Sequence, residues 1–513
     1  MADDRTPVLI GGGHFTQRTA QQGKFDESLN PMQMLEKAAR LATADTGKSD
    51  AVLKAFDAVA VVRFTADSPE AGRLPVGQYK NPPRSLAKLL GATPAQEYYT
   101  ATGGNTPQYL VNLMAERIAN GETECALLAG AEDLATLIGA LKRGVKLEWG
   151  DDPGGSYTPI GVEKRGVTDH EKAHGLQFPV NTYPLFENAI RGEKKHTLAE
   201  HQRALGELFS PFTKIAAENP LSWFPTFRTP EEIATPGERN RIVGFPYTKY
   251  LCSVIEVDMA AAVVMTSVKR ARELGVPESQ WVYLHGCGDA NDLWYVTERV
   301  NYTSSPAIRA MTRSAFSMAG KTVADMNYFD LYSCFAAAVQ IGCKELGIET
   351  ADPRGLTVTG GLPYFGGAGN NYVMHSIVTM MQKVRAKPGS FGLVTANGWF
   401  VTKHSCGIYS TTPTNGPWKR EDPKTYQKVI DAEAHPRVVE TANGEGKVET
   451  YTAVTDRTGR KFGIVIGRMA DGARFLANTY DEALWNRMIS EEMLNRPIHV
   501  THAEGKNTFV LAE

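Results

Sequence analysis

The sequence predicts an α/β protein of two similar halves, with a segment inserted between them and a small antiparallel β-barrel at the C-terminal end. A pattern of strand, loop and helix runs through residues 1–146 and recurs in residues 241–416. It lapses in residues 147–240, which are rich in aromatic residues and amphipathic helices. Residues 425–513 alternate in the manner of strands between turn signals, as in small closed sheets. We expect each half to hold a mostly parallel sheet covered by helices.

Composition describes a globular protein and excludes several classes of function. The formal net charge is −2 and the chain has no long basic run, so nucleic acid is not an expected partner. Apolar runs stay below the roughly 18–20 residues of a membrane span, and the N-terminus lacks the pattern of a signal peptide. The six cysteines show neither CxxC pairs nor metal-ligand spacing, which indicates reduced thiols and no metal. We therefore expect a cytoplasmic protein.

In the first half, the apolar runs at 7–13 and 56–62 predict buried strands, and 31–47 predicts an amphipathic helix between them. Three glycines end the first run, and we expect them to form a tight turn rather than a nucleotide site. Apolar residues at helical spacing predict a further helix at 106–120, followed by a strand at 125–129.

The second half is expected to begin with a buried strand at 256–267, after the inserted segment. Strands at 281–286 and 392–395 follow, and a third strand runs into Tyr332. Helices separate these strands, so the order repeats that of the first half.

The last part of the chain changes character after a charged, proline-containing linker at 419–424. Residues 444–478 alternate in the strand manner, with turn signals at 456–459 and 471–472. Residues 497–512 add two more expected strands, which together make up a barrel of roughly 90 residues.

A dense group of glycines follows the strand that runs into Tyr332 and the helix expected after it. Six glycines fall between residues 355 and 370, and a helix comes directly after them. Glycines at this density allow a backbone to approach a ligand closely, and helix N-termini attract anions. We expect this loop to form the floor of a binding site. Its candidate ligand-binding residues are Gly360, Gly361, Gly366, Gly367 and Asn370.

These motifs resemble those of thiolases, in particular the sterol-carrier-protein type. The segment DLYSCF at 330–335 resembles their Glu-Leu-His-Asp-Cys-Phe motif, and 359–367 resembles their Ser-Gly-Gly to Gly-His-Pro loop. The placement of residues 425–513 resembles the additional C-terminal domain of thiolase-like protein type 1. The resemblance implies a thiolase fold, with two similar βαβ halves layered αβαβα and a loop domain that packs over an acyl-CoA.

The sequence departs from thiolases at each catalytic position. The family uses a nucleophilic cysteine, a histidine, a second cysteine and an oxyanion-site histidine or asparagine. Residue by residue, these positions hold Thr100, Gly367, Asn397 (or Ala396 if the register shifts by one) and Tyr332. Acyl transfer through a cysteinyl thioester is therefore not expected, and Thr100 is expected to be a helix cap or a polar wall of the pocket.

Other chemistry remains open to such a site. A tyrosine at the position of Tyr332 also occurs in thiolase-like aldolases, which cleave β-hydroxyacyl-CoA in steroid side-chain degradation with a small barrel-fold partner. Tyr332 can act as the base of such a step if its pKa falls, which a helix N-terminus would favour. The alternative for each candidate tyrosine is a buried ring whose hydroxyl is simply hydrogen-bonded. Tyr247 or Tyr250 is the candidate second phenol. The residues expected to line an oxyanion site are Asn370, Asn371 and His375, with the N–H groups of the glycine loop.

Two alternatives to the aldolase interpretation remain. One is an acyltransferase of the acetyl-CoA acetyltransferase type with a rearranged site, and the other is a non-catalytic acyl-CoA-binding module. In every case coenzyme A enters as part of the substrate, and no permanently bound cofactor is expected. Cys334 and Cys406 are expected to be packed thiols. The chain is expected to be a homodimer, as thiolases usually are, or a monomer.

Overall fold

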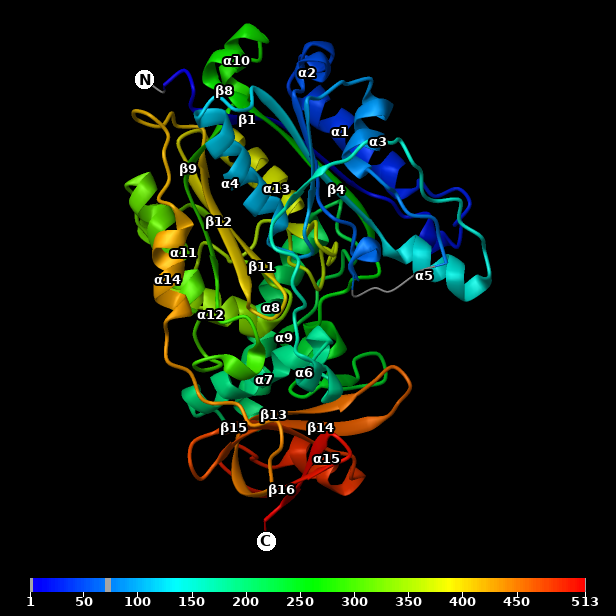
Figure 1. Cartoon of the computed structure of the whole chain (residues 1–513), viewed down its shortest axis with the longest axis vertical. Helices are drawn as coiled ribbons and strands as arrows, with labels where there is room; N and C mark the ends of the chain where they lie inside the picture. The colour runs from blue at the N-terminus through cyan, green and yellow to red at the C-terminus, as the bar shows by residue number, and fades with distance from the viewer. Residues whose placement is uncertain (1–2, 70–74, 513) are drawn as a thin grey trace.

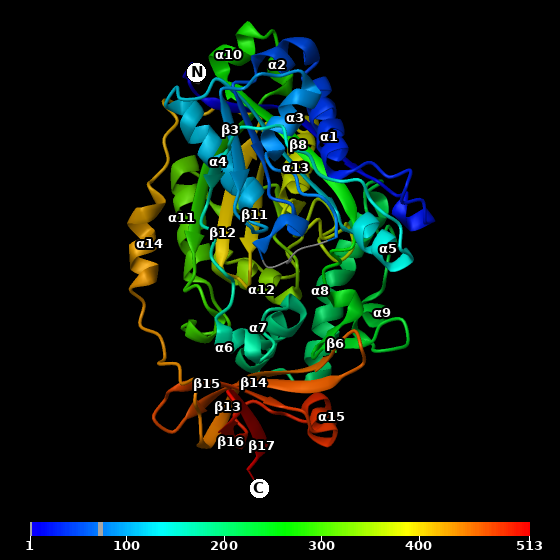
Figure 2. The same cartoon turned by 45° about the vertical axis from the view of Figure 1, so that its right-hand side comes forward.

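A computed structural model describes residues 3–69 and 75–512 of the chain. A layered body of sheet and helices forms one end of the molecule, and the C-terminal barrel forms the other (Figure 1). Helices α7, α8 and α9 lie between the body and the barrel in both views (Figures 1 and 2). No helix among the described residues is both long enough and apolar enough to cross a membrane.

The first half contributes six strands to the sheet of the body. They are β1 (Pro7–Thr16), β2 (Ala58–Val61), β3 (Gln96–Thr100), β4 (Cys125–Asp133), β5 (Thr158–Ile160) and β8 (Asp258–Ser267). The helices of this half are α1 (Pro31–Asp45), α2 (Ser49–Ala55), α3 (Pro82–Leu90), α4 (Thr106–Ala119) and α5 (Leu134–Arg143). Strands β2 to β5 are parallel, whereas β8 runs antiparallel to both β4 and β1.

The second half adds four strands, in the order β10-β11-β12-β9. They are β9 (Val282–Asn291), β10 (Tyr328–Asp330), β11 (Phe391–Gly398) and β12 (Lys403–Ser410). Its helices are α10 (Val268–Glu273), α11 (Pro306–Ala319), α12 (Ala336–Leu346), α13 (Tyr372–Ala386) and α14 (Pro423–Asp431). Strand β9 meets β1 at two residue pairs, which joins the two sets of strands into one ten-stranded sheet.

Two expectations about this sheet are wrong. In the second half only β10 and β11 are parallel, so that half is mostly antiparallel. Strand β8 does not begin the second half, because it pairs with β4 and β1 and so completes the first. The inserted segment separates β8 from the rest of its half along the chain, so the order of elements in the sequence does not reveal that β8 pairs with β1 and β4.

The body has five layers, as the thiolase resemblance implies. Helices α1 and α3 cover the outer face of the first half, and α11 and α14 cover the outer face of the second. Helices α4 and α13 lie between the two sets of strands and contact both. Helix α14 packs against β9 through Tyr426, whose hydroxyl donates to the carbonyl of Asp289 at 2.8 Å. This helix therefore packs on the body and precedes the first strand of the barrel, β13 (Gly444–Thr455).

The inserted segment is mostly helical. Its elements are α6 (Asp169–Ala173), α7 (Pro179–Lys194), α8 (Leu198–Glu218) and α9 (Pro230–Ala234), followed by β6 (Ile242–Gly244) and β7 (Tyr247–Thr248). Helix α8 begins with a capping box, in which Thr197 and Glu200 satisfy each other's backbone N–H groups. The short 3-10 helices of the chain include η2 (Thr65–Asp67), η4 (Lys249–Leu251), η6 (Val296–Glu298) and η7 (Val323–Asp325).

The C-terminal domain is a closed five-stranded barrel, as the sequence predicts. Its elements are β13 (Gly444–Thr455), β14 (Lys461–Met469), β15 (Arg474–Thr479), α15 (Glu482–Ser490), β16 (Pro497–Ala503) and β17 (Lys506–Leu511). The strand order β13-β14-β15-β17-β16 returns to β13, and the helix between the third and fourth strands gives the connectivity of an OB-type barrel. The β15–β17 pairing is parallel, and the other ring pairings are antiparallel.

The three glycines of β1 do not form the tight turn that the sequence predicts, because the strand continues through them to Thr16. A side chain at Gly11 or Gly13 would collide with the backbone of α1, and one at Gly12 would meet Val378 of α13. These glycines therefore allow helices to approach β1 closely from both sides.

We predict that Gly13→Ala lowers the free energy of unfolding by about 1–3 kcal/mol, since the added methyl group overpacks the contact with α1. Urea denaturation measures this change. Gly237→Ala is the matched control, because an added side chain there meets no atom of the described residues within 4 Å. Equal stability of the two variants would contradict the packing role of Gly13.

Candidate active site

Three loops from both halves of the body meet at one place. They are the loop between β3 and α4, the segment that follows β10, and the loop between β11 and β12. A side chain at Gly104 would collide with the hydroxyl of Tyr332 and with the carbonyl oxygen of Asn397. A side chain at Gly103 would collide with Asn105 and Lys403. The thiolase-like positions 100–104, 332 and 397 are therefore neighbours, as the resemblance implies.

Asn370 joins the glycine loop to the first half. Its side-chain oxygen accepts a hydrogen bond from the N–H of Gly103 at 2.9 Å, and its amide nitrogen donates to the carbonyl of Arg63 at 2.9 Å. Its backbone N–H donates to Glu132 at 3.0 Å, and Glu132 also accepts from Thr65. The amide of Asn370 thus holds two loops together.

Tyr332 is positioned by its backbone, whose N–H donates to the hydroxyl of Thr395 at 3.0 Å. Its side chain is 9% exposed, and its hydroxyl makes no hydrogen bond with any residue that the structure describes. Burial, together with the nearby Cys334, raises the pKa of Tyr332 well above its usual value of 10. Helix α12 begins only at Ala336. The expectation of a base with a lowered pKa is therefore wrong, and the phenol stays neutral.

Thr100 is neither a helix cap nor a pocket wall. It ends β3, is fully buried, and its hydroxyl accepts from the N–H of Arg63 at 2.9 Å. Helix α4 begins six residues later, at Thr106. Asn397 lies in the loop cluster as expected, and its amide donates to the hydroxyl of Tyr183 at 2.9 Å. The side-chain oxygen of Asn397 is buried and has no hydrogen-bond partner among the residues that the structure describes.

Tyr247 makes its hydrogen bonds outside this cluster. Its hydroxyl donates to Glu187 at 2.5 Å and accepts from the N–H of Ala337 at 3.1 Å. Burial and the charge of Glu187 raise the pKa of Tyr247 well above 10. Tyr250 lies beneath the guanidinium of Arg228, which is 3.9 Å from its ring centre. Neither tyrosine is placed as a second phenol beside Tyr332.

His375 lies in the core rather than in an oxyanion site. It is fully buried on α13, with its ring centre 5.5 Å from that of His14 and 5.4 Å from that of Phe365. Neither ring nitrogen has a hydrogen-bond partner among the described residues. Burial lowers the pKa of His375 well below 6.5, so the imidazole is neutral. Asn371, one turn earlier, donates to the carbonyl of Gly130 at 2.7 Å.

The candidate glycines are crowded by protein atoms. Added side chains would collide with Ala216 at Gly360, with Phe212 and Ser333 at Gly361, with Met259 at Gly366, and with Ser253 and Val254 at Gly367. Packing therefore explains why these positions are glycine. The expectation that a ligand occupies the space of the missing side chains is wrong.

Two residues of the cluster escaped the sequence analysis. Lys403 is buried at the start of β12, and its ammonium donates to the carbonyl of Thr102. The hydroxyl of Tyr183, on α7, donates to the carbonyl of Trp399 at 2.9 Å while accepting from Asn397. Neither residue belongs to a motif. The available signal for Lys403 was its position at the head of a buried strand, where a lysine is rare.

The N-terminus of α4 presents hydrogen-bond donors to this cluster. The backbone N–H groups of Gly104 and Asn105 have no acceptor in the part of the chain that the structure describes. Within residues 3–69 and 75–512, the buried side-chain oxygen of Asn105 has no hydrogen-bond partner either. Because the positive end of the helix dipole lies here, the cluster favours negative charge on a bound oxygen atom.

Comparison with known proteins identifies the family. Residues 425–505 match the model of the thiolase-like protein type 1 additional C-terminal domain. A solved structure described as a monomeric SCP2-thiolase-like protein type 1 from Mycobacterium smegmatis is 37% identical, with a TM-score of 0.85 and 100% of both chains covered. The chain belongs to the SCP2-thiolase-like protein type 1 family. The search of curated proteins found no match to this chain.

More distant structures share the fold of this SCP2-thiolase-like protein. One is an aldolase described as Ltp2-ChsH2(DUF35), 20% identical with a TM-score of 0.57, covering 79% of this chain and 98% of that one. Another is the acetyl-CoA acetyltransferase from Syntrophomonas wolfei, 15% identical with a TM-score of 0.54, covering 80% of this chain and 100% of that one.

The thiols of this thiolase-like protein are not poised for catalysis. Burial raises the pKa of Cys334 to about 12, and that of Cys406 well above 9. A thiol with so high a pKa is rarely ionised, and the thiolate is the nucleophile. No group of three potential metal ligands occurs among residues 3–69 and 75–512.

Glu132 generates a pH prediction. Burial raises its pKa from 4.5 to about 7, so the folded protein binds a proton that the unfolded chain releases at a lower pH. This contribution to stability is fully present below about pH 4.5 and is lost as the pH rises through 7, at a cost of about 3 kcal/mol. Glu132→Gln removes the titration. The stability of the wild type relative to Glu132→Gln should therefore fall between pH 5 and pH 8.

Thermal unfolding of the two proteins across this range checks the prediction. A stability difference between wild type and Glu132→Gln that stays constant from pH 5 to pH 8 would contradict it.

Proposed function

We propose that this protein acts on an acyl-CoA thioester without a cysteinyl intermediate, and cleaves or forms a carbon–carbon bond of a β-hydroxyacyl-CoA. The observation that carries the proposal is a set of hydrogen-bond donors with no acceptor in the described part of the chain, placed where a thiolase would hold its reacting groups. Those donors are the N–H groups of Gly104 and Asn105 and the neutral hydroxyl of Tyr332.

The proposed reaction is of the retro-aldol type. In the cleavage direction the β-hydroxyl loses its proton to a base and becomes a carbonyl group. The Cα–Cβ bond breaks, and its electron pair moves onto the thioester as an enolate, which is then protonated at Cα. Donors aimed at the enolate oxygen stabilise the charge that develops there. The raised pKa of Tyr332 suits this donor role, because a phenol donates only while it is protonated.

The choice between an aldolase and an acyltransferase rests on the missing thiol. Acyl transfer by the thiolase route needs a thiolate, and the corresponding position holds the buried, hydrogen-bonded Thr100. The aldolase structure that shares this fold includes ChsH2(DUF35) as a second named component. Thiolase-like aldolases work with a small barrel-fold partner, and in this chain a barrel is fused to the thiolase-like body. We therefore favour the aldolase, with an acyl chain of the lipid or steroid side-chain class. We further propose a monomeric cytoplasmic protein that meets coenzyme A only in its substrate.

We predict that Tyr332→Phe lowers kcat on a β-hydroxyacyl-CoA by roughly 10²–10³-fold, as loss of an oxyanion donor does. The affinity for CoA should stay almost unchanged, because the ring and its packing remain. Released aldehyde or ketone is measured across a panel of β-hydroxyacyl-CoAs. Tyr250→Phe is the control, since Tyr250 lies outside the cluster. Full activity of Tyr332→Phe on a substrate that the wild type cleaves would exclude this role.

We also predict that acetoacetyl-CoA thiolysis is absent, and that Cys334→Ala and Cys406→Ala leave carbon–carbon cleavage intact. Thiolysis that either mutation abolishes would show that a buried thiol is the nucleophile. If the panel yields no product while acyl-CoA binds, the protein is a binding module, and the proposed reaction is wrong.

A further inference from the structure

A buried arginine of the barrel, Arg474, makes hydrogen bonds with the body. Arg474, on β15, is fully buried and donates to the carbonyl of Thr297 at 2.8 Å and to that of Arg299 at 2.5 Å. Its other nitrogens pair with Glu449 at 2.9 and 2.8 Å, and its guanidinium lies 4.8 Å from the ring centre of Tyr302. Arg474 thereby fixes the backbone of a turn that belongs to the second half.

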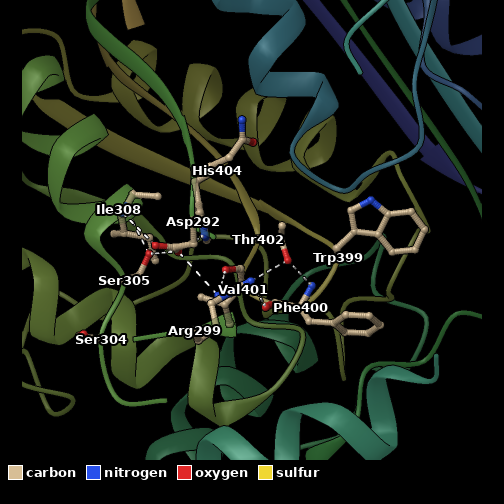
Figure 3. Close-up of polar contacts among 12 residues, drawn as sticks. Asp292, Arg299, Ser304, Ser305, Ile308, Trp399, Phe400, Val401, Thr402 and His404 are labelled. Atoms are coloured by element: carbon tan, nitrogen blue, oxygen red, sulfur yellow. Dashed lines mark hydrogen bonds and ion pairs between the residues drawn. The ribbon is translucent and has the colours of Figure 1, made fainter. Parts of the chain in front are cut away.

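Arg299 continues this contact toward the candidate active site. Its buried guanidinium donates to the carbonyls of Val401 at 2.6 Å and Phe400 at 3.0 Å, and to the hydroxyl of Thr402 at 2.8 Å. Figure 3 shows Arg299 beside this segment, with Asp292 between Ser305 and His404. Asp292 lies 3.9 Å from Arg299 and supplies the opposite charge. A buried charge is retained at this place because it is bonded and paired.

The loop that Arg299 holds is strained. Trp399 and Val401 have φ angles of 57° and 54°, in the left-handed region that a β-branched residue rarely adopts. Such conformations persist where the surroundings fix them, and they cluster at functional sites. The hydroxyl of Tyr183 holds the same loop from α7, since it donates to Trp399 and accepts from the N–H of Val401 at 3.3 Å.

This loop connects Asn397 to Lys403, two residues of the candidate active site. The carbonyl oxygen of Asn397 and the hydroxyl of Tyr332 both lie beside Gly104. The ammonium of Lys403 donates to the carbonyl of Thr102. A change in the backbone of residues 399–402 therefore moves both side chains relative to the donors of α4.

We propose that the C-terminal barrel holds the candidate active site in its working geometry, through a relay from Arg474 to Arg299 to the loop at residues 399–402. Arg474 and Arg299 are then positioning residues for Asn397 and Lys403. The importance of these two residues for turnover rests on the function proposed above. The mechanical relay does not, because its effect on the loop exists without substrate.

The barrel supplies a matched control. Arg468, on β14, pairs with the same Glu449 at 2.7 and 2.9 Å, but its remaining bond stays within the barrel, to the carbonyl of Gly472 at 3.0 Å. Arg474→Met and Arg468→Met each remove one arginine from Glu449. Only the first removes a contact with the turn at Thr297 and Arg299.

Hydrogen–deuterium exchange of the full chain without substrate tests the relay. We expect Arg474→Met to speed exchange of the amides in residues 398–403 by about tenfold or more relative to wild type, and Arg468→Met to change it little. The amides concerned are held by the loop itself, through Thr402 to Gly398 at 3.2 Å and Phe400 to the Thr402 hydroxyl at 3.3 Å. Wild-type exchange of this loop in a folded Arg474→Met protein would overturn the proposal.

Two further variants keep the proposal testable if Arg474→Met does not fold. Thr402→Val and Arg299→Lys act at the far end of the relay, and each should speed exchange of the same loop while the barrel peptides stay protected. Unchanged loop exchange in both would overturn the proposal. On an active substrate, Arg474→Met should lower kcat with little change in KM. Faster loop exchange without any measurable reaction would uphold the relay and refute the proposed function alone.

Discussion

The candidate active site depends on a side-chain amide that binds two loops at once. Asn370 connects the glycine loop of the second half to Gly103 and Arg63 of the first, and Glu132 accepts from its backbone. All of these groups are buried or nearly so, and an unpaired buried polar group costs about 1–3 kcal/mol. The loops therefore cannot separate without leaving several donors unsatisfied. This constraint holds the N-terminus of α4 beside Tyr332.

A second constraint acts on the opposite side of the site. The loop between β11 and β12 takes a left-handed backbone at a tryptophan and a valine, and neither residue favours that conformation. Arg299 and Tyr183 hold it with hydrogen bonds to four of its backbone groups and one hydroxyl. One clamp comes from the body and the other from the inserted segment. The inserted helix α7 thus contacts this loop directly through Tyr183, and the barrel contacts the body at Arg299 through Arg474.

The sequence predicted the architecture better than the chemistry. Repeated strand–helix patterns, the lapse at 147–240 and the alternating C-terminal strands correspond to the layered body, the inserted helices and the barrel. The assignment of β8 to the second half was wrong because its pairing partners, β1 and β4, lie before the inserted segment in the sequence. Tyr247 was misjudged because Glu187, which binds it, lies 60 residues away along the chain. Arg299 was missed because a single charged residue outside a motif carries no signal until its partners are known, and for Lys403 the signal was limited to its position at the head of a buried strand.

The surroundings of Gly367 show why replacing it with histidine would not restore the catalytic residues of a thiolase. The space that a histidine would need there is filled by Ser253 and by the carbonyl of Val254, which accepts from the N–H of Gly367 at 2.9 Å. Ser253 in turn donates through its N–H to the carbonyl of Cys334 at 3.1 Å, two residues after Tyr332. A larger side chain at 367 must therefore shift the segment that positions the phenol. The absent histidine and the neutral tyrosine belong to one packing arrangement, so the chemistry of this site differs from thiolase chemistry in its backbone as well as in its side chains.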